Sequence, residues 1–314
     1  MSSYIMTRMN PGTRDALKSR IDFYTEHGGE DHENVFYTTK KEDVNEWSVE
    51  TKYFSSGPEN QIIEKENGNV YFFTGSLYNC DINKAVDLYH EHKDKFVDYI
   101  DGEYLFLEVN KETDKINIYT DFYGTRAGYI TTTRYAFYLG SFGVGKFVDY
   151  MDHRIAKTPI KTTRLKPNTH TQFDLYTNEI IETTLQREQQ TISFEEAVLK
   201  RYEPDCTVIS WGDKGSKAIE DCLNKHNLKF NSIDVKEVDI EEDSLVIEML
   251  KVHPEMDLGI PKISLSRKKF FYNVFRHIKR NSKSRIVLNS RKNMLHFYES
   301  MSLLNNLEVR NCCL

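Results

Sequence analysis

The sequence lacks the features that mark several large classes of protein. It contains no apolar run near the roughly 20 residues that a membrane-spanning helix needs, and its first residues form no continuous apolar stretch of the secretory type. Its five cysteines include no CxxC pair and its ten histidines no HExxH motif, so no metal site is predicted. Walker A, GxGxxG and GxSxG motifs are also missing. These absences favour a cytoplasmic protein with reduced thiols and no membrane contact.

What is present is the composition of a folded protein. The 314 residues are 39% apolar, 29% charged and 12% aromatic, and this length allows two domains of about 150 residues each. A polar stretch at 186–190 marks the boundary, so we expect domains at 1–188 and 193–314. In the first domain, alternating or apolar patterns rich in β-branched and aromatic residues predict strands, and two segments predict helices. The strands are 35–39, 70–74, 103–109, 115–119, 135–140, 171–175 and 180–184, and the helices are 12–27 and 81–99.

The second half alternates between strand and helix patterns. Ser193 and Glu196 have the spacing of a capping box and predict a helix start. Strands are then predicted at 207–210, 229–235 and 285–288, with helices at 217–226 and 242–252, a basic helix, and a last helix. This alternation is typical of an open, mainly parallel sheet. Cys312 and Cys313 are expected to lie in a frayed tail.

The net charge of −6 conceals a basic segment. Residues 266–292 contain ten lysines and arginines and no acidic residue, which leaves the rest of the chain strongly acidic. Such a patch can attract phosphate-rich partners, but apolar residues at spacings of three and four also predict a helix whose charges cover the solvated face. The basic residues are Arg267, Lys268, Lys269, Arg276, Lys279, Arg280, Lys283, Arg285, Arg291 and Lys292.

Six motifs follow one another in an order that resembles asparagine synthetases and, more generally, class II glutamine amidotransferases. They are HGGED (27–31), FTGSLYN (73–79), DGEYLF (101–106), DFYGTR (121–126), VISWGDKGS (208–216) and RIVLNSRK (285–292). The resemblance implies an α+β N-terminal-nucleophile-hydrolase-like sandwich of stacked antiparallel sheets flanked by helices. A small, truncated α/β domain of the ATP-pyrophosphatase type would follow it.

The residues that such a glutaminase uses are mostly replaced. The family's nucleophilic cysteine corresponds to Ser2, which is the one candidate catalytic residue. The arginine that holds the glutamine carboxylate corresponds to Gly28, and the asparagine that stabilises the oxyanion corresponds to Thr74. By the same resemblance, the remnant glutamine site consists of Gly75, Asn79 and Asp101. The turn motif DFYGTR and the segment LKPN (165–168) keep their glycine and proline, which serve folding rather than chemistry.

The synthetase-like half shows the same loss. Its loop would cradle pyrophosphate with backbone N–H groups at a helix N-terminus. The remnant phosphate loop is Ser210, Gly212, Lys214 and Ser216, in which Lys214 stands where the family has an aspartate. A one-residue shift would instead make Asp213 the acid. The family's later carboxylates are absent from 290–297, so no cofactor is predicted and Mg-ATP binding is disfavoured.

Two alternatives stay open at this point. Residues 206–280 also resemble glutaredoxin, which would give a mixed four-stranded sheet, whereas the synthetase-like arrangement places strand 285–288 beside strand 207–210 in a parallel sheet. The function predicted first is a non-catalytic protein that binds a protein partner or an anionic ligand, with a homodimer also compatible. The alternatives are a divergent amidotransferase or ATP-dependent amide ligase, and a nucleic-acid-associated protein that uses the basic segment 267–292.

Overall fold

A computed structural model describes residues 3–9, 31–37, 46–53, 60–65, 68–110, 112–126, 128–132, 137–140, 161–174, 177, 179–187, 192–239, 265–282, 284, 286–290 and 307–312. The chain divides into two compact units, Ser2–Glu188 and Gln189–Leu314. Among the described residues, no helix combines the length and apolar character needed to cross a membrane.

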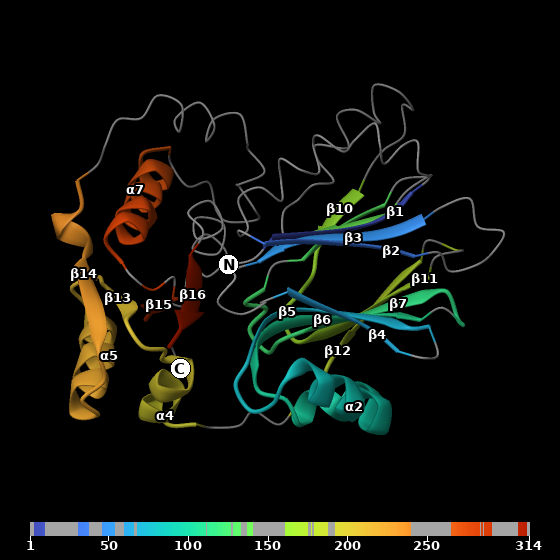
Figure 1. Ribbon diagram of the computed structural model, residues 1–314, viewed down its shortest axis with the longest axis horizontal. Coiled ribbons are helices and arrows are strands. Elements are labelled where there is room, and N and C mark those ends of the chain that lie inside the picture. The colour runs from blue at the N-terminus through green and yellow to red at the C-terminus, as the bar shows by residue number, and fades with distance from the viewer. Residues whose placement is uncertain are drawn as a thin grey trace. The chain divides into compact units, whose positions relative to one another are not determined.

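The first unit contains two six-stranded antiparallel sheets (Figure 1). Sheet A has the order β10-β8-β9-β1-β3-β2, and sheet B has the order β12-β11-β7-β6-β5-β4. The strands of sheet A are β1 (Ser3–Met9), β2 (Asp31–Tyr37), β3 (Glu46–Tyr53), β8 (Tyr129–Thr132), β9 (Phe137–Gly140) and β10 (Lys161–Arg164). Those of sheet B are β4 (Asn60–Glu64), β5 (Val70–Leu77), β6 (Gly102–Asn110), β7 (Lys115–Thr120), β11 (Thr169–Asp174) and β12 (Ile180–Thr184).

The two sheets stack face to face through one apolar core. Met6, Ile130 and Leu139 of sheet A belong to the same buried cluster as Phe72 and Leu107 of sheet B. Full burial of each such side chain stabilises the fold by roughly 1.5–3 kcal/mol. The stacked antiparallel sheets expected from the family resemblance are therefore present in this unit.

The other face of sheet B is covered by α2 (Ile82–His92), as Figure 1 shows. The 3-10 helix η1 (Lys93–Asp98) packs in the same buried cluster through Phe96 and Val97. The predicted cap is confirmed, because the Asp81 side chain accepts a hydrogen bond from the backbone N–H of Lys84. The predicted single helix at 81–99 is wrong in its second half. Lys93 has φ of +53° and ψ of −132°, which lies outside the helical region and ends α2, and the residues from Lys93 onward form the tighter η1 turn.

The second unit is a three-layer arrangement around a four-stranded parallel sheet, sheet C, with the order β14-β13-β15-β16. A cluster that includes Phe275 of α7 and Val287 of β15 covers one face. Another, which includes Val198 of α4 and Leu223 of α5, covers the other face. The elements are α4 (Phe194–Arg201), β13 (Cys206–Ser210), α5 (Lys214–Lys225), β14 (Phe230–Asp234), η2 (Val235–Glu237), α7 (Leu265–Asn281), β15 (Ile286–Asn289) and β16 (Glu308–Asn311).

The structure of the second unit tests three predictions, which concern the start of α4, the type of sheet and the C-terminal tail. The capping interaction at the start of α4 is confirmed, since Ser193 Oγ accepts from the N–H of Glu196. The described strands are all parallel, with β15 beside β13, so they do not form the mixed sheet that the glutaredoxin-like alternative requires. The prediction that Cys312 lies in a frayed tail is wrong. This residue is fully buried and its N–H donates to the Asn289 carbonyl, so it continues the β16 packing.

Other differences concern element ends and missed strands. Helix α5 begins three residues earlier than predicted, at Lys214, because Asp213 caps it. Strands β1, β3, β4, β8, β10 and β16 were not predicted. The helices expected at 12–27, at 242–252 and after β15 lie outside the described residues.

The two turn motifs of the first unit pack on each other. The buried Asp121 carboxylate accepts from the N–H groups of Tyr123 and Thr125 and from the Thr125 hydroxyl. Gly124 has φ of +61°, and a Cβ there would lie 2.9 Å from Pro167 Cγ. Burial raises the pKa of Asp121, while these hydrogen bonds lower it. The glycine and the proline thus shape a turn, as the sequence indicated, and the hydrogen bonds of Asp121 hold it.

Candidate functional site

The candidate site lies at the carboxyl ends of the strands of sheet C. The chain passes from β13 to β14 on one side and returns to β15 on the other side of β13. The crevice outside such a reversal is where open α/β sheets usually bind ligands. The loop after β13, which contains Trp211 and Gly212, and the residue after β15, Ser290, meet there.

A carboxylate of the chain itself occupies the N-terminus of α5. Asp213 Oδ1 accepts from the backbone N–H of Ser216 at 2.8 Å and from its hydroxyl at 2.8 Å. Ser290 Oγ is 3.4 Å from the same oxygen. The Ser216 hydroxyl also accepts from the N–H of Trp211 at 3.1 Å, and the whole residue is buried. The hydroxyl and amide that could receive a phosphate oxygen are therefore engaged within the protein.

The Trp211 side chain packs inside this edge of the sheet. Only 8% of Trp211 is exposed, its ring packs against Phe271, and its indole N–H donates to Asn289 Oδ1 at 3.0 Å. The Asn289 amide donates in turn to Asn311 Oδ1 at 2.8 Å. The hydrogen-bonded chain from Trp211 to Asn311 fixes the indole between β15 and α7.

Two cations lie near the loop. Lys214 is the exposed first residue of α5, and Lys236 Nζ would be 3.3 Å from a Cβ added to Gly212, whose φ is +69°. Ser210 is the last residue of β13. The structure thus gathers the predicted Ser210, Gly212, Lys214 and Ser216 in one loop and helix start. Of the two possible registers, it places Asp213 at the helix cap.

The basic segment is mostly carried by α7. Phe271, Val274, Phe275 and Ile278 form the buried stripe that the sequence predicted. Arg267, Lys279 and Arg280 are exposed, whereas Lys269 and Arg276 are half-buried. The side chain of Lys268 and the residues Lys283, Arg285, Arg291 and Lys292 lie outside what the structure describes.

Of the residues predicted as a remnant glutamine site, Asn79 and Asp101 are joined by a contact between side chain and backbone. Asn79 Nδ2 donates to the Tyr99 carbonyl and Asn79 Oδ1 accepts from the Asp101 N–H, both at 2.8 Å. Gly75 lies inside β5, before Asn79 in the chain, and pairs with Tyr104 of β6. Asn79 therefore ties the end of β5 to the segment before β6, which is a structural use of its amide. Ser2 lies outside the described residues.

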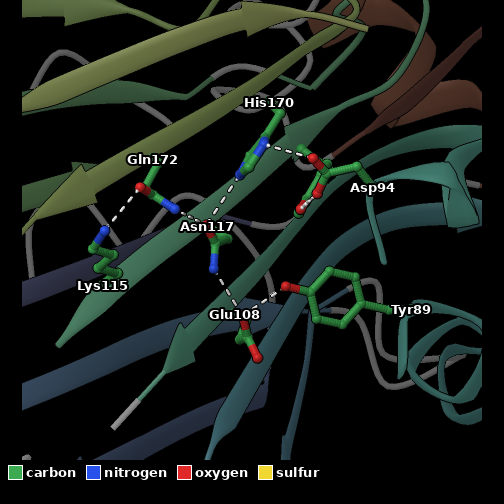
Figure 2. Close-up of polar contacts among 8 residues, drawn as sticks. Tyr89, Asp94, Glu108, Lys115, Asn117, His170 and Gln172 are labelled. Atoms are coloured by element: carbon green, nitrogen blue, oxygen red, sulfur yellow. Dashed lines mark hydrogen bonds and ion pairs between the residues drawn. The ribbon is translucent and has the colours of Figure 1, made fainter. Parts of the chain in front are cut away.

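Sequence reasoning missed a polar network on the face of sheet B that lies under α2 and η1 (Figure 2). At its centre is the Glu108 carboxylate, which is 4% exposed. It accepts hydrogen bonds from Asn69, Tyr71, Tyr89 and Asn117 at 2.7–3.3 Å. The signal available in the sequence was a charged residue between Leu107 and Val109 in the predicted strand 103–109.

Thiol and metal chemistry gain no support from the described residues. Cys206 is fully buried, and burial raises the pKa of its thiol to about 11, so little thiolate forms at neutral pH. No group of three or more His, Cys, Asp or Glu side chains suited to a metal ion occurs in the part of the chain that the structure describes.

The geometry defines a two-layer antiparallel sandwich followed along the chain by a three-layer unit with a parallel sheet. No protein-family model and no curated protein matches the sequence. The chain is similar to the solved structure of glutamine phosphoribosylpyrophosphate amidotransferase from B. subtilis complexed with ADP and GMP. The identity is 11%, the match covers 92% of this chain and 75% of that chain, and the TM-score is 0.41.

A second similar structure is described as the allosteric regulatory enzyme of purine biosynthesis. Its identity is 10%, with 98% of this chain and 80% of that chain covered, at a TM-score of 0.39. The first of these proteins is named as a glutamine amidotransferase, and neither is named as an asparagine synthetase. At these TM-scores the likeness is too distant to assign an activity.

Proposed function

We propose that this chain is a non-catalytic relative of the asparagine synthetases and class II glutamine amidotransferases that acts by binding a protein partner. The observation that carries the proposal is the Asp213 carboxylate on the N-terminus of α5, next to the buried Trp211. A protein that binds nucleotide phosphates at this edge needs those N–H groups free for the ligand.

The energetics favour the internal carboxylate over a bound phosphate. Asp213 sits where the helix dipole favours a negative charge, and a cap of this kind contributes about 1 kcal/mol to stability. A phosphate would have to displace this side chain or approach it against like-charge repulsion. The nearby Lys214 and Lys236 offset part of that repulsion, which makes a weak anion site the competing interpretation.

Removing the Asp213 carboxylate is therefore expected to create anion affinity. Asp213→Ala should lower the free energy of unfolding by about 1 kcal/mol and should allow pyrophosphate to bind at least tenfold more tightly than to the wild-type chain. Isothermal titration calorimetry with pyrophosphate measures the gain.

The matched control is Asp81→Ala. Asp81 caps α2 with the same geometry, at 2.8 Å, but in the first unit. It should cost similar stability with no gain in pyrophosphate binding. Tight pyrophosphate or Mg-ATP binding by the wild-type chain would contradict the proposal.

Turnover assays separate this function from its enzymatic alternative. The wild-type chain should release no glutamate from glutamine and form no AMP or pyrophosphate, alone or with its partner. Clear turnover that is lost in Ser2→Ala would instead establish a divergent amidotransferase that uses the serine hydroxyl.

Nucleic-acid binding is favoured by one observation, the exposed Arg267, Lys279 and Arg280 on a helix that has no acidic residue. Binding of this kind weakens steeply with salt. Absent or salt-independent binding to DNA and RNA would leave the protein partner as the function.

A further inference from the structure

The polar network of sheet B fixes the orientation of every amide in it. Glu108 lies on β6 and, as a carboxylate, can only accept hydrogen bonds. Asn117 must therefore turn its Nδ2 toward Glu108 Oε2, at 2.8 Å, which leaves its Oδ1 facing β11. At the opposite end, Lys115 Nζ can only donate, and it lies 3.3 Å from Gln172 Oε1. Gln172 must therefore turn its amide nitrogen toward Asn117 Oδ1, at 3.0 Å.

These orientations decide which nitrogen of His170 carries hydrogen. His170 Nε2 lies 3.0 Å from Asn117 Oδ1, an oxygen that can only accept. Nε2 must therefore be the donor. In the neutral imidazole the other nitrogen, Nδ1, then has a lone pair and no hydrogen. The tautomer follows from the fixed ends of the network, Glu108 and Lys115, and not from the ring itself.

The lone pair of neutral His170 points at an acceptor. Nδ1 lies 3.5 Å from Oδ2 of Asp94, a residue of η1. The other oxygen of Asp94 accepts from the Tyr119 hydroxyl at 2.5 Å. Figure 2 shows His170 placed between Asn117 and Asp94. A neutral ring gives Asp94 no hydrogen bond, whereas a protonated ring donates to Asn117 and Asp94 together.

We propose that His170 is a proton-operated latch, which ties η1 to β11 when the imidazole is protonated and releases it when the imidazole is neutral. The proposal goes beyond the proposed function and does not depend on it. Asp94 is well placed to move, because 61% of its side chain is exposed against 14% for His170.

The groups that face His170 set the pH at which the latch closes. Tyr119 of β7 stacks on the imidazole at 4.4 Å, Asp94 faces it from η1, and Glu108 of β6 acts through Asn117. Lys115 of β7 lies beyond Gln172. Burial lowers the pKa of His170, and Asp94 and Glu108 raise it by less, so the latch closes below the ordinary histidine pKa of about 6.5.

The sign for stability follows from the lowered pKa. Folding then favours neutral His170, so its contribution to stability is present above pH of about 6.5 and is lost as the pH falls through the folded-state pKa. Closing the latch thus orders η1 locally while the fold as a whole becomes less stable. The η1 segment is followed in the chain by Tyr99 and Asp101, whose backbone groups form hydrogen bonds with the Asn79 side chain.

The test follows the ring and the turn in the full-length chain. Nitrogen-15 NMR of His170 should show the Nε2–H tautomer above its pKa. Hydrogen exchange at the Tyr99 amide, which donates to the Phe96 carbonyl, should slow roughly tenfold on protonation after correction for intrinsic rates.

Two variants make opposite predictions. His170→Gln should abolish the pH dependence of this protection. Asp94→Asn should keep the latch closed above the His170 pKa, where it is open in the wild-type chain, because an amide can donate to neutral Nδ1 while its oxygen still accepts from Tyr119. The control is His226→Gln, which removes an exposed histidine paired with Glu195 in the second unit and should change nothing in η1. An Nδ1–H tautomer, or unchanged pH dependence in His170→Gln, would overturn the proposal.

Discussion

Replacing Glu108 with leucine is expected to lower the free energy of unfolding of the first unit by about 3–5 kcal/mol. The carboxylate is the shared acceptor for four side chains, and it is 4% exposed. Tyr71 can turn its hydroxyl to His90 Nε2, which lies 3.0 Å away. Tyr89 and Asn117 then lose this acceptor, and each buried donor left without a partner costs about 1–3 kcal/mol.

The measurement uses the two tryptophans of the chain, Trp47 and Trp211. In a Trp211→Phe background, Trp47 of β3 reports urea unfolding of the first unit alone. The control is Glu182→Leu, the same change on the exposed strand β12, where Glu182 pairs with Lys166 at the surface. That change should cost less than about 1 kcal/mol. Equal decreases in the free energy of unfolding for the two variants would show that the hydrogen bonds to Glu108 do not stabilise the first unit.

Strands whose local pattern was strong could be predicted from the sequence. Residues 70–74, 103–109 and 115–119 fall within β5, β6 and β7, because apolar and β-branched residues dominate strands that are buried on both faces. The caps at Asp81 and Ser193 were also predictable, since capping depends on three neighbouring residues and on little else.

What could not be predicted depends on distant partners. Strand β16 looks like a polar tail, and it becomes a strand because Val309 and Arg310 pair with β15 some 20 residues earlier. Arg310 is 7% exposed and donates to Glu203 Oε1 at 2.7 Å, a contact more than 100 residues apart in the chain.

The position of the loop at the candidate site could be predicted from the sequence, whereas the charge at the N-terminus of the following helix could not. The motif VISWGDKGS located the loop at the carboxyl end of β13. Whether Asp213 or Lys214 occupies the helix N-terminus depends on where α5 begins, and a shift of one residue reverses the sign of the charge there. The role of Glu108 could not be predicted, because the residues that donate hydrogen bonds to it, Asn69, Tyr89 and Asn117, come from other segments of the chain.

Replacing Gly75 with alanine is expected to cost more than about 4 kcal/mol and to unfold the first unit at moderate temperature. A Cβ at this position would lie 2.0 Å from the Glu103 carbonyl oxygen and 2.9 Å from Tyr104 Cα. Both are backbone atoms of the paired strand β6, so relief requires the β5–β6 ladder to separate. Gly75 also has φ of +121°, a region that a side chain opposes.

The control is Gly212→Ala in the second unit, where φ is also positive, at +69°. The nearest atom to a Cβ there is Lys236 Nζ, at 3.3 Å, the end of a flexible side chain. That variant should cost only about 1–2 kcal/mol, the usual strain of a left-handed residue. Thermal unfolding followed by Trp47 in a Trp211→Phe background, and by Trp211 in a Trp47→Phe background, reports the two units separately. A Gly75→Ala loss no larger than that of Gly212→Ala would mean that β5 and β6 can part locally. Position 75 would then tolerate a side chain where the structure leaves room only for hydrogen.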